Sequence, residues 1–187
     1  MTITVSYRFD DAVILITGAG SGIGAALARH CVREGAAVIA VDRRHDALLD
    51  GLEAGARRRI DVRRVDVADE AAVAALIGDV KNKYPRLDAA VLGAAVQYRT
   101  DLDRMDSAQW REVIDINLNG VFYCLQAVIP LLKSQRAGAI VAFTSGLALT
   151  GWPGASAYAA SKAALIGMIR SAAHELKNHN VRANVLS

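Results

Sequence analysis

The stretch Thr17-Gly-Ala-Gly-Ser-Gly-Ile-Gly24 decides how this chain folds. It follows a continuous apolar run, Ala12-Val-Ile-Leu-Ile16, which is typical of a strand that is buried on both faces of a parallel sheet. After it, apolar residues recur at four-residue spacing from Ile23 to Cys31, which indicates a helix that ends near Gly35. The glycines therefore occupy the turn between a buried strand and a helix.

Strands and helices continue to alternate outward from this turn. Further strands are predicted at 37–41, 59–67, within 88–95, at 139–143 and at 181–186, and helices at about 46–56, 69–84, 107–133 and 156–178. Parallel neighbours need crossover helices, and these crossovers are right-handed. The pattern predicts an α/β fold, a doubly wound parallel sheet of the Rossmann type in three α/β/α layers, with residues 1–187 as one domain.

Several local features can be predicted more closely. The third strand, 59–67, alternates with more polar residues, as expected near a sheet edge. Asp69 is predicted to cap the next helix, and Ser107 to cap the long helix that reaches about Lys133. Pro130 is expected to kink or shorten that helix.

Composition excludes several classes of protein. The 187 residues are 53% hydrophobic and 22% charged, which is typical of a globular domain. A formal net charge of only +3, with scattered arginines, argues against a nucleic-acid partner. The apolar run at 12–16 is too short to span a membrane, and Cys31 and Cys124 lack metal-ligand spacing. A cytoplasmic protein without a metal or a membrane partner is expected.

The glycine loop has the properties of a dinucleotide-binding turn. Gly18 can make the tight turn, Gly22 lets the backbone approach a pyrophosphate, and Gly24 lets helix and strand pack closely. The N–H groups at the start of the following helix then face the phosphates. The spacing reads G-x-x-x-G-x-G instead of the more usual G-x-G-x-x-G.

Asp42 favours NAD over NADP. It closes the second strand, where a carboxylate can accept hydrogen bonds from the adenosine ribose and would repel a 2′-phosphate. Arg43 and Arg44 leave NADP as the second choice, because an arginine could neutralise that phosphate.

Three residues form a candidate reaction centre. Tyr158 and Lys162 are four positions apart, which places both on one face of a helix. A nearby ammonium favours the tyrosinate, so the phenol could exchange a proton closer to neutral pH. Ser145 follows the fifth strand, where its hydroxyl could hold a substrate oxygen or simply form a turn.

Together these motifs resemble the classical short-chain dehydrogenases/reductases over essentially the whole chain. The loop at 17–24 matches that family's T-G-x-x-x-G-x-G, and Tyr158 and Lys162 match its Y-x-x-x-K, with Ser145 thirteen residues before the tyrosine. Asn117 matches the family's helix asparagine. Asp66 and Val67 resemble its adenine-contacting pair.

The resemblance implies a role for each of these residues. Tyr158 would be the general acid/base, Ser145 would orient the substrate oxygen, and Asn117 would help to hold a proton-relay water. Lys162 would bind the nicotinamide ribose and tune Tyr158. The cofactor-binding set implied is Gly18, Ser21, Gly22, Ile23, Gly24, Asp42, Arg43, Asp66, Val67, Gly93, Ala94, Ala95, Tyr158 and Lys162.

The chain departs from the family in two places. Leu92-Gly-Ala-Ala95 stands where the family has N-N-A-G, which removes two asparagine side chains and adds a methyl group at Ala95. The sequence also stops at Ser187, before the segment that in the family covers the substrate and supplies the last helix and strand, so strand 181–186 is expected at an unpaired edge.

Two functions therefore remain open. The first is an NAD(P)-dependent oxidoreductase acting on a secondary alcohol or ketone, and the second is a non-catalytic dinucleotide-binding or oligomer-forming fragment. A homodimer or homotetramer would form through the helices that contain Asn117 and Tyr158, as the resemblance implies.

Overall fold

The computed structural model describes residues 8–45, 48–50 and 52–187 of the chain. Its strands are β1 (Val13–Thr17), β2 (Ala37–Asp42), β3 (Ile60–Arg64), β4 (Ala89–Leu92), β5 (Gly138–Phe143) and β6 (Val181–Leu186). Its helices are α1 (Gly22–Arg33), α2 (Ala54–Arg57), α3 (Glu70–Lys83), α4 (Ser107–Ile114), α5 (Gly120–Gln135), α6 (Leu147–Thr150) and α7 (Ser156–Leu176). A π-helical turn, Asp115–Asn119, joins α4 to α5, and a 3-10 turn, Lys177–His179, follows α7.

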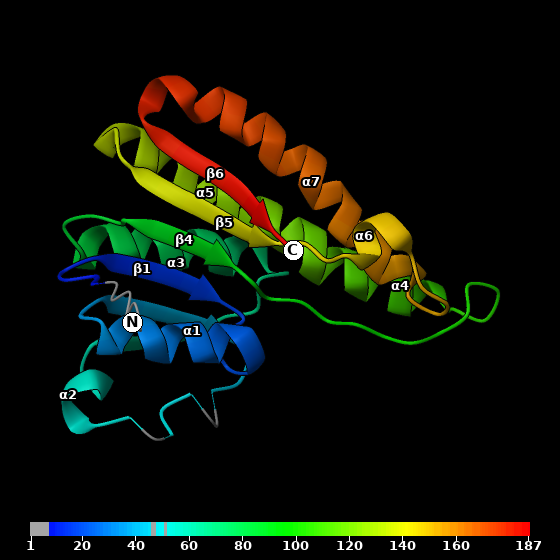
Figure 1. The fold of residues 1–187 in the computed structure, drawn as a ribbon, viewed down its shortest axis with the longest axis horizontal. Helices are drawn as coiled ribbons and strands as arrows, with labels where there is room; N and C mark the ends of the chain where they lie inside the picture. Colours follow the sequence, from blue (N-terminus) through cyan, green and yellow to red (C-terminus); the bar gives the residue numbers. More distant parts are fainter. Residues whose placement is uncertain (1–7, 46–47, 51) are drawn as a thin grey trace, which may run out of the picture.

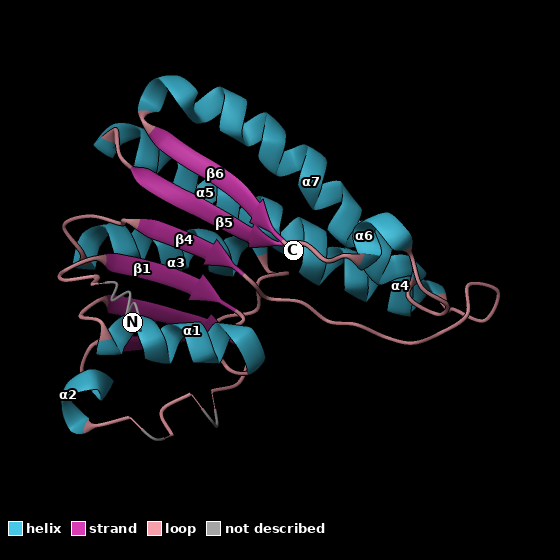
Figure 2. Cartoon of the chain, viewed as in Figure 1, coloured by secondary structure: helices cyan, strands magenta, loops and turns pink. Residues whose placement is uncertain are grey.

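The six strands form one parallel sheet in the order β3-β2-β1-β4-β5-β6 (Figures 1 and 2). The strand order reverses between β1 and β4, which creates a crevice at their carboxyl ends. The predicted Rossmann-type sheet is confirmed, with β3 and β6 at its two edges as expected.

Two apolar clusters hold the layers together. One packs α1 and the segment around Leu48 and Leu52 against one face of the sheet, through residues such as Ile16 and Val38. The other packs α3, α5 and α7 against the opposite face, through residues such as Leu125. Figure 1 shows α1 in front of β2, with α3 and α5 behind the sheet. The helices thus lie on both faces, as in a doubly wound fold.

The α3 prediction is confirmed in detail. The Asp69 side chain accepts a hydrogen bond from the N–H of Ala72 at 3.0 Å, which caps the helix. The predicted apolar face is the buried face, formed by Val73, Leu76, Ile77 and Val80.

Three other predictions are wrong in part. The cap of α4 is Asp106 and not Ser107. Its carboxylate accepts from the N–H of Gln109 at 2.7 Å, and its backbone has the extended conformation that a cap needs.

Pro130 does not shorten α5, which continues to Gln135. The proline ring lies on an exposed side of the helix, where water can solvate the carbonyl that the missing N–H leaves unpaired.

The helix predicted at 46–56 is also largely wrong. Residues 48–50 form a turn and α2 covers only Ala54–Arg57, while 46, 47 and 51 lie outside the described residues. Two glycines, Gly51 and Gly55, lower the helix propensity of this stretch.

The helical run Ser107–Gln135 is long and apolar enough, by length and composition, to cross a membrane. Its apolar residues Ile116, Val121, Leu125, Val128 and Leu132 are buried in the core against the sheet. The apolar composition of this run is therefore used by the core of the fold.

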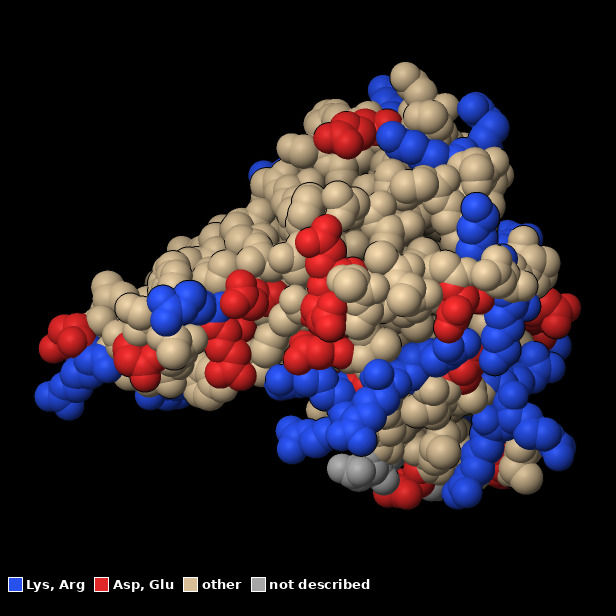
Figure 3. Space-filling view, turned by 180° about the vertical axis from the view of Figure 1, so that it is seen from behind, with Lys and Arg blue, Asp and Glu red and all other residues tan. Residues whose placement is uncertain are grey.

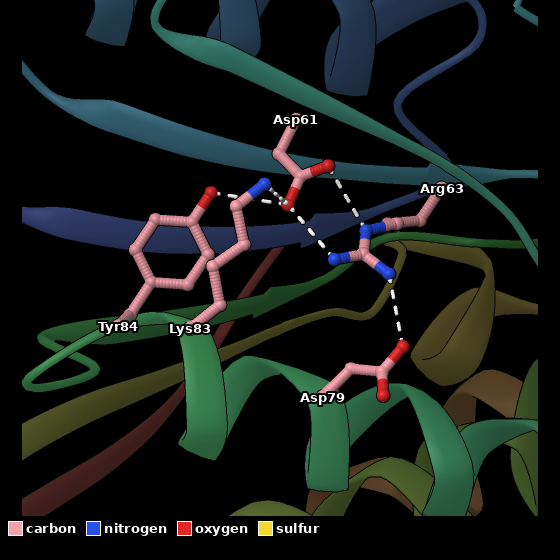
Figure 4. A network of polar contacts seen from close by, with 5 residues as sticks. All are labelled: Asp61, Arg63, Asp79, Lys83 and Tyr84. Carbon is pink, nitrogen blue, oxygen red and sulfur yellow. Dashed lines mark hydrogen bonds and ion pairs between the residues drawn. The ribbon is translucent and has the colours of Figure 1, made fainter.

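An ion-pair network ties the edge strand β3 to α3 (Figure 4). The Asp61 carboxylate accepts hydrogen bonds from Arg63, Lys83 and Tyr84 at 2.9–3.1 Å. Arg63 also pairs with Asp79 at 3.1 Å. Acidic and basic side chains are intermixed on this side of the molecule (Figure 3), so part of its positive charge is neutralised within the protein.

Candidate active site

A cleft of about 520 Å³ opens at the carboxyl ends of the strands, where the sheet order reverses. The structure brings every residue of the predicted cofactor-binding set to its walls: Gly18, Ser21, Gly22, Ile23, Gly24, Asp42, Arg43, Asp66, Val67, Gly93, Ala94, Ala95, Tyr158 and Lys162. It also adds Arg44, which the sequence offered as a possible partner of a 2′-phosphate, and residues that the motifs did not mark: Val41, Val65, Val96, Ile116, Phe143, Thr144, Leu186 and Ser187.

The three motif glycines are needed for different reasons. A Cβ on Gly18 would lie 2.8 Å from the backbone of Gly93 and Ala94, and its φ of +73° also favours glycine. A Cβ on Gly24 would lie 2.1 Å from the carbonyl oxygen of Gly18, so α1 can pack this close to the loop only without a side chain. Gly22 has a φ of +52° and nothing within 4 Å, which leaves open space at the first residue of α1. A dinucleotide pyrophosphate fits that space and the N–H groups of the helix start.

Asp42 joins the glycine loop to the turn after β2. Its Oδ2 accepts a hydrogen bond from the N–H of Gly20 at 2.9 Å, and its Oδ1 accepts one from the N–H of Arg44 at 3.1 Å. The neighbouring Arg43 guanidinium is 3.5 Å from the Asp66 carboxylate. One acidic and one basic side chain at this end of the cleft therefore contact neighbouring protein groups.

Lys162 is a buried charge at the other end of the cleft. Only 2% of the residue is exposed, and burial lowers the pKa of its ammonium to about 8. Its Nζ donates to the carbonyl oxygen of Phe143 at 2.8 Å and lies 5.7 Å from the centre of the Tyr158 ring. The Thr144 hydroxyl donates to the carbonyl oxygen of Lys162 at 2.8 Å. Two hydrogen bonds thus fasten the end of β5 to the turn of α7 that carries Tyr158 and Lys162.

Ser145 follows this fastened segment but is not among the residues that line the cleft. Its Oγ accepts a hydrogen bond from the N–H of Leu147 at 3.2 Å, at the start of α6. The hydroxyl therefore has the turn-forming role that the sequence allowed as an alternative. Its hydrogen remains available for a substrate oxygen, because accepting a bond does not use it.

Asn117 lies in the π-helical turn and is fully buried. Its side chain accepts from the N–H of Val96 at 2.8 Å and donates to the Val96 carbonyl at 2.9 Å and to Ser161 Oγ at 3.2 Å. Ser161 in turn donates to the Tyr158 carbonyl at 2.7 Å. Asn117 thus connects the loop after β4 to the helix turn of Tyr158, instead of making the local backbone bond usual for a helix asparagine.

Phe143 packs against one position of the altered stretch Leu92–Ala95, namely Gly93. Leu92 belongs to the buried core, and a Cβ on Gly93 would lie 2.9 Å from the Phe143 ring. The aromatic ring takes the space beside Gly93 that a longer side chain would need. The main-chain N–H groups of Gly93 and Ala94 bond to Thr17 Oγ1, at 3.1 and 3.3 Å, and these bonds join the end of β1 to the residues after β4.

Comparisons with known proteins agree with this arrangement. The family model described as "short chain dehydrogenase" matches residues 12–187. The chain is 39% identical to the 3-oxoacyl-(acyl-carrier-protein) reductase FabG of Thermotoga maritima, over 96% of the chain and 74% of that protein. It is 34% identical to the 3beta-hydroxysteroid dehydrogenase of Mediterraneibacter gnavus, over 96% of the chain and 66% of that protein.

The crystal structure of an NAD+-bound xylitol dehydrogenase superimposes with a TM-score of 0.89 at 30% identity, over 97% of the chain and 71% of that structure. These matches confirm the predicted fold and the predicted class of enzyme, an oxidoreductase of the short-chain dehydrogenase type.

Proposed function

The chain belongs to the short-chain dehydrogenase family, and we propose that it transfers a hydride between NAD and a secondary alcohol or its ketone. The observation that carries this proposal is that Tyr158 and Lys162 line the same cleft as the glycine loop. One domain, residues 1–187, then holds both the cofactor and the proton-transfer group. The nicotinamide, when bound, supplies the hydride chemistry.

Tyr158 is the general acid/base in this proposal. Its hydroxyl gives a proton to the carbonyl oxygen during reduction and takes it back during oxidation. Lys162 sits one helical turn away with its ammonium held by the Phe143 carbonyl, so a positive charge stays close to the Tyr158 ring. Ser145 donates its free hydroxyl hydrogen to the same substrate oxygen.

Asn117 acts as a positioning residue. Its two amide hydrogens go to Val96 and Ser161 and its Oδ1 accepts from Val96, so the side chain has no hydrogen left to donate to a proton-relay water. The π-helical turn around it interrupts the regular pattern of helix hydrogen bonds, and such turns frequently occur at functional sites.

NAD is the proposed cofactor, with NADP the less favoured one. A carboxylate at the end of β2, Asp42, lines the cleft and would repel a 2′-phosphate. Arg43, which could neutralise that phosphate, is directed to Asp66. The NAD+-bound state of the similar xylitol dehydrogenase also favours this choice.

A panel of secondary alcohols and ketones, followed through NADH absorbance, tests the proposed reaction. We expect NAD-dependent turnover that Tyr158→Phe removes. Calorimetry with NAD+ and NADP+ distinguishes the proposed oxidoreductase from the alternative, a non-catalytic dinucleotide-binding module. Such a module would bind a cofactor without any turnover. Binding of neither cofactor would contradict both readings.

We also expect the protein to form a homodimer or homotetramer through α4, α5 and α7. Trp110 and Phe122 leave 38% and 46% of their surface exposed on the α4–α5 run, and burial of such aromatic side chains drives association. Light scattering of the chain and of Phe122→Glu tests this interface. A monomer at micromolar concentration in the unchanged chain would contradict it.

A cytoplasmic location fits the state of the two cysteines. Cys31 and Cys124 are free and buried, and burial raises the pKa of their thiols to about 11 and about 12. Free thiols are the usual state of cysteine in a reducing compartment. Fractionation of the source cells, followed by immunoblotting, tests the location.

A further inference from the structure

Gly20 leaves less room for a side chain than any of the motif glycines Gly18, Gly22 and Gly24. It occupies a variable position of the glycine loop, yet a Cβ built on it would lie 1.8 Å from the carbonyl oxygen of Arg44 and 2.8 Å from Cγ of Asp42. Its φ is not in the left-handed region, so the requirement is one of space. The turn after β2 can rest on the glycine loop only because residue 20 lacks a side chain.

This contact holds the Asp42 carboxylate from both sides. One oxygen accepts from the N–H of Gly20 at 2.9 Å and the other from the N–H of Arg44 at 3.1 Å. The two donors belong to the two backbone segments that touch at Gly20. An ionised carboxylate has about four acceptor positions, so about two remain, enough for a vicinal diol.

We infer that Gly20 is a cofactor-specificity residue: its missing side chain lets the turn at Arg44 close on the glycine loop and hold Asp42 where it selects a ribose diol over a 2′-phosphate. This inference rests on the proposed use of NAD. A side chain at position 20 pushes the Arg44 carbonyl away. This movement separates the two backbone segments, so that either the Gly20 N–H or the Arg44 N–H no longer reaches the Asp42 carboxylate. The carboxylate then loses its fixed direction, and the space beside it widens.

The experiment is calorimetric titration of the unchanged chain, Gly20→Ser and Gly20→Ala with NAD+ and with NADP+. In both variants we expect the affinity for NAD+ to fall by about ten- to a hundredfold, the effect of losing one hydrogen bond between the ribose diol and the displaced Asp42 carboxylate. The affinity for NADP+ should change much less, so the ratio of the two affinities falls.

Gly78→Ser is the matched control. Gly78 lies on the exposed side of α3 with nothing within 4 Å of an added Cβ, so the same change there should leave both affinities unaltered. The inference is wrong if either Gly20 variant keeps the original ratio of its NAD+ and NADP+ affinities, whether both affinities fall together or neither changes. Failure of a Gly20 variant to fold, seen by circular dichroism, also contradicts it, because the glycine would then serve folding and not cofactor choice. A preference for NADP+, or binding of neither cofactor, by the unchanged chain would instead refute the proposed function.

Discussion

The side-chain ammonium of Lys162 donates a hydrogen bond to the main-chain carbonyl of Phe143, with 2.8 Å between Nζ and the oxygen. The lysine is buried and the phenylalanine is the last residue of β5, so this bond links α7 to the end of that strand. The buried ammonium of Lys162 is costly to keep charged, so the free energy of unfolding depends on pH.

Lys162→Met removes that dependence. The unfolded chain keeps the proton on Lys162 up to a pKa of 10.5, whereas burial lowers the pKa of the folded chain to about 8. Between these values the unfolded state binds more protons, so the contribution of Lys162 to the free energy of unfolding rises with pH. Between pH 7 and 9.5 this rise is about 2 kcal/mol.

Urea unfolding of both proteins at these two pH values measures the effect. We expect the unchanged chain to gain stability relative to Lys162→Met as the pH is raised. A difference between the two proteins that stays constant over this range would show that the lysine is not buried as a charge.

Tyr158→Phe is expected to lower turnover by about 10²- to 10⁴-fold, the usual contribution of a general acid or base. The affinity for NAD+ should stay nearly constant, because only the phenolic oxygen is removed. Steady-state kinetics and calorimetry measure the two quantities. Tyr123→Phe, in α5 and away from the cleft, is the control and should keep full activity.

Gly93→Asn is expected to destabilise the fold by about 1–3 kcal/mol, because the new side chain meets the Phe143 ring. Combining it with Phe143→Val should recover part of that loss. A double-mutant cycle in urea measures the coupling, which should exceed about 0.5 kcal/mol for residues in contact. Simple additivity of the two changes would show that the ring does not occupy the space beside Gly93.

Asp61→Asn is expected to cost about 1–3 kcal/mol at neutral pH, since the Arg63 and Lys83 cations lose their shared partner. Burial raises the pKa of Asp61, but the hydrogen bonds from Arg63, Lys83 and Tyr84 outweigh burial and hold it below the ordinary 3.8. The stabilisation is thus present above about pH 4 and is lost as the pH falls through the lowered pKa.

Acid titration of both proteins, followed by circular dichroism, checks this prediction. The two stabilities should converge at low pH, once the carboxyl group is protonated. Asp79→Asn is the control, because 65% of its side chain is exposed and surface pairs contribute little. An equal loss from both substitutions would contradict a central role for Asp61.

Much of the fold could be predicted from the sequence because its determinants are local. The apolar runs, the cap at Asp69 and the buried face of α3 depend on residues within a turn or two of one another. The spacing of Tyr158 and Lys162 places them on one helix face for the same reason. The stretch 46–56 shows the limit, since glycines and tertiary contacts outweighed its weak helix pattern.

The finer structure of the site depends on contacts that only the tertiary fold creates. Gly20 meets Arg44, Gly93 meets Phe143 and Asn117 meets Val96 across 21 to 50 residues of chain, and no local pattern marks these pairs. The sequence by itself determined the sheet, the glycine turn and the residues at the ends of the strands. The packing of those strands and loops decided which glycine is essential, which lysine is buried and where each polar side chain is held, because steric exclusion and desolvation depend on what lies beside an atom in space.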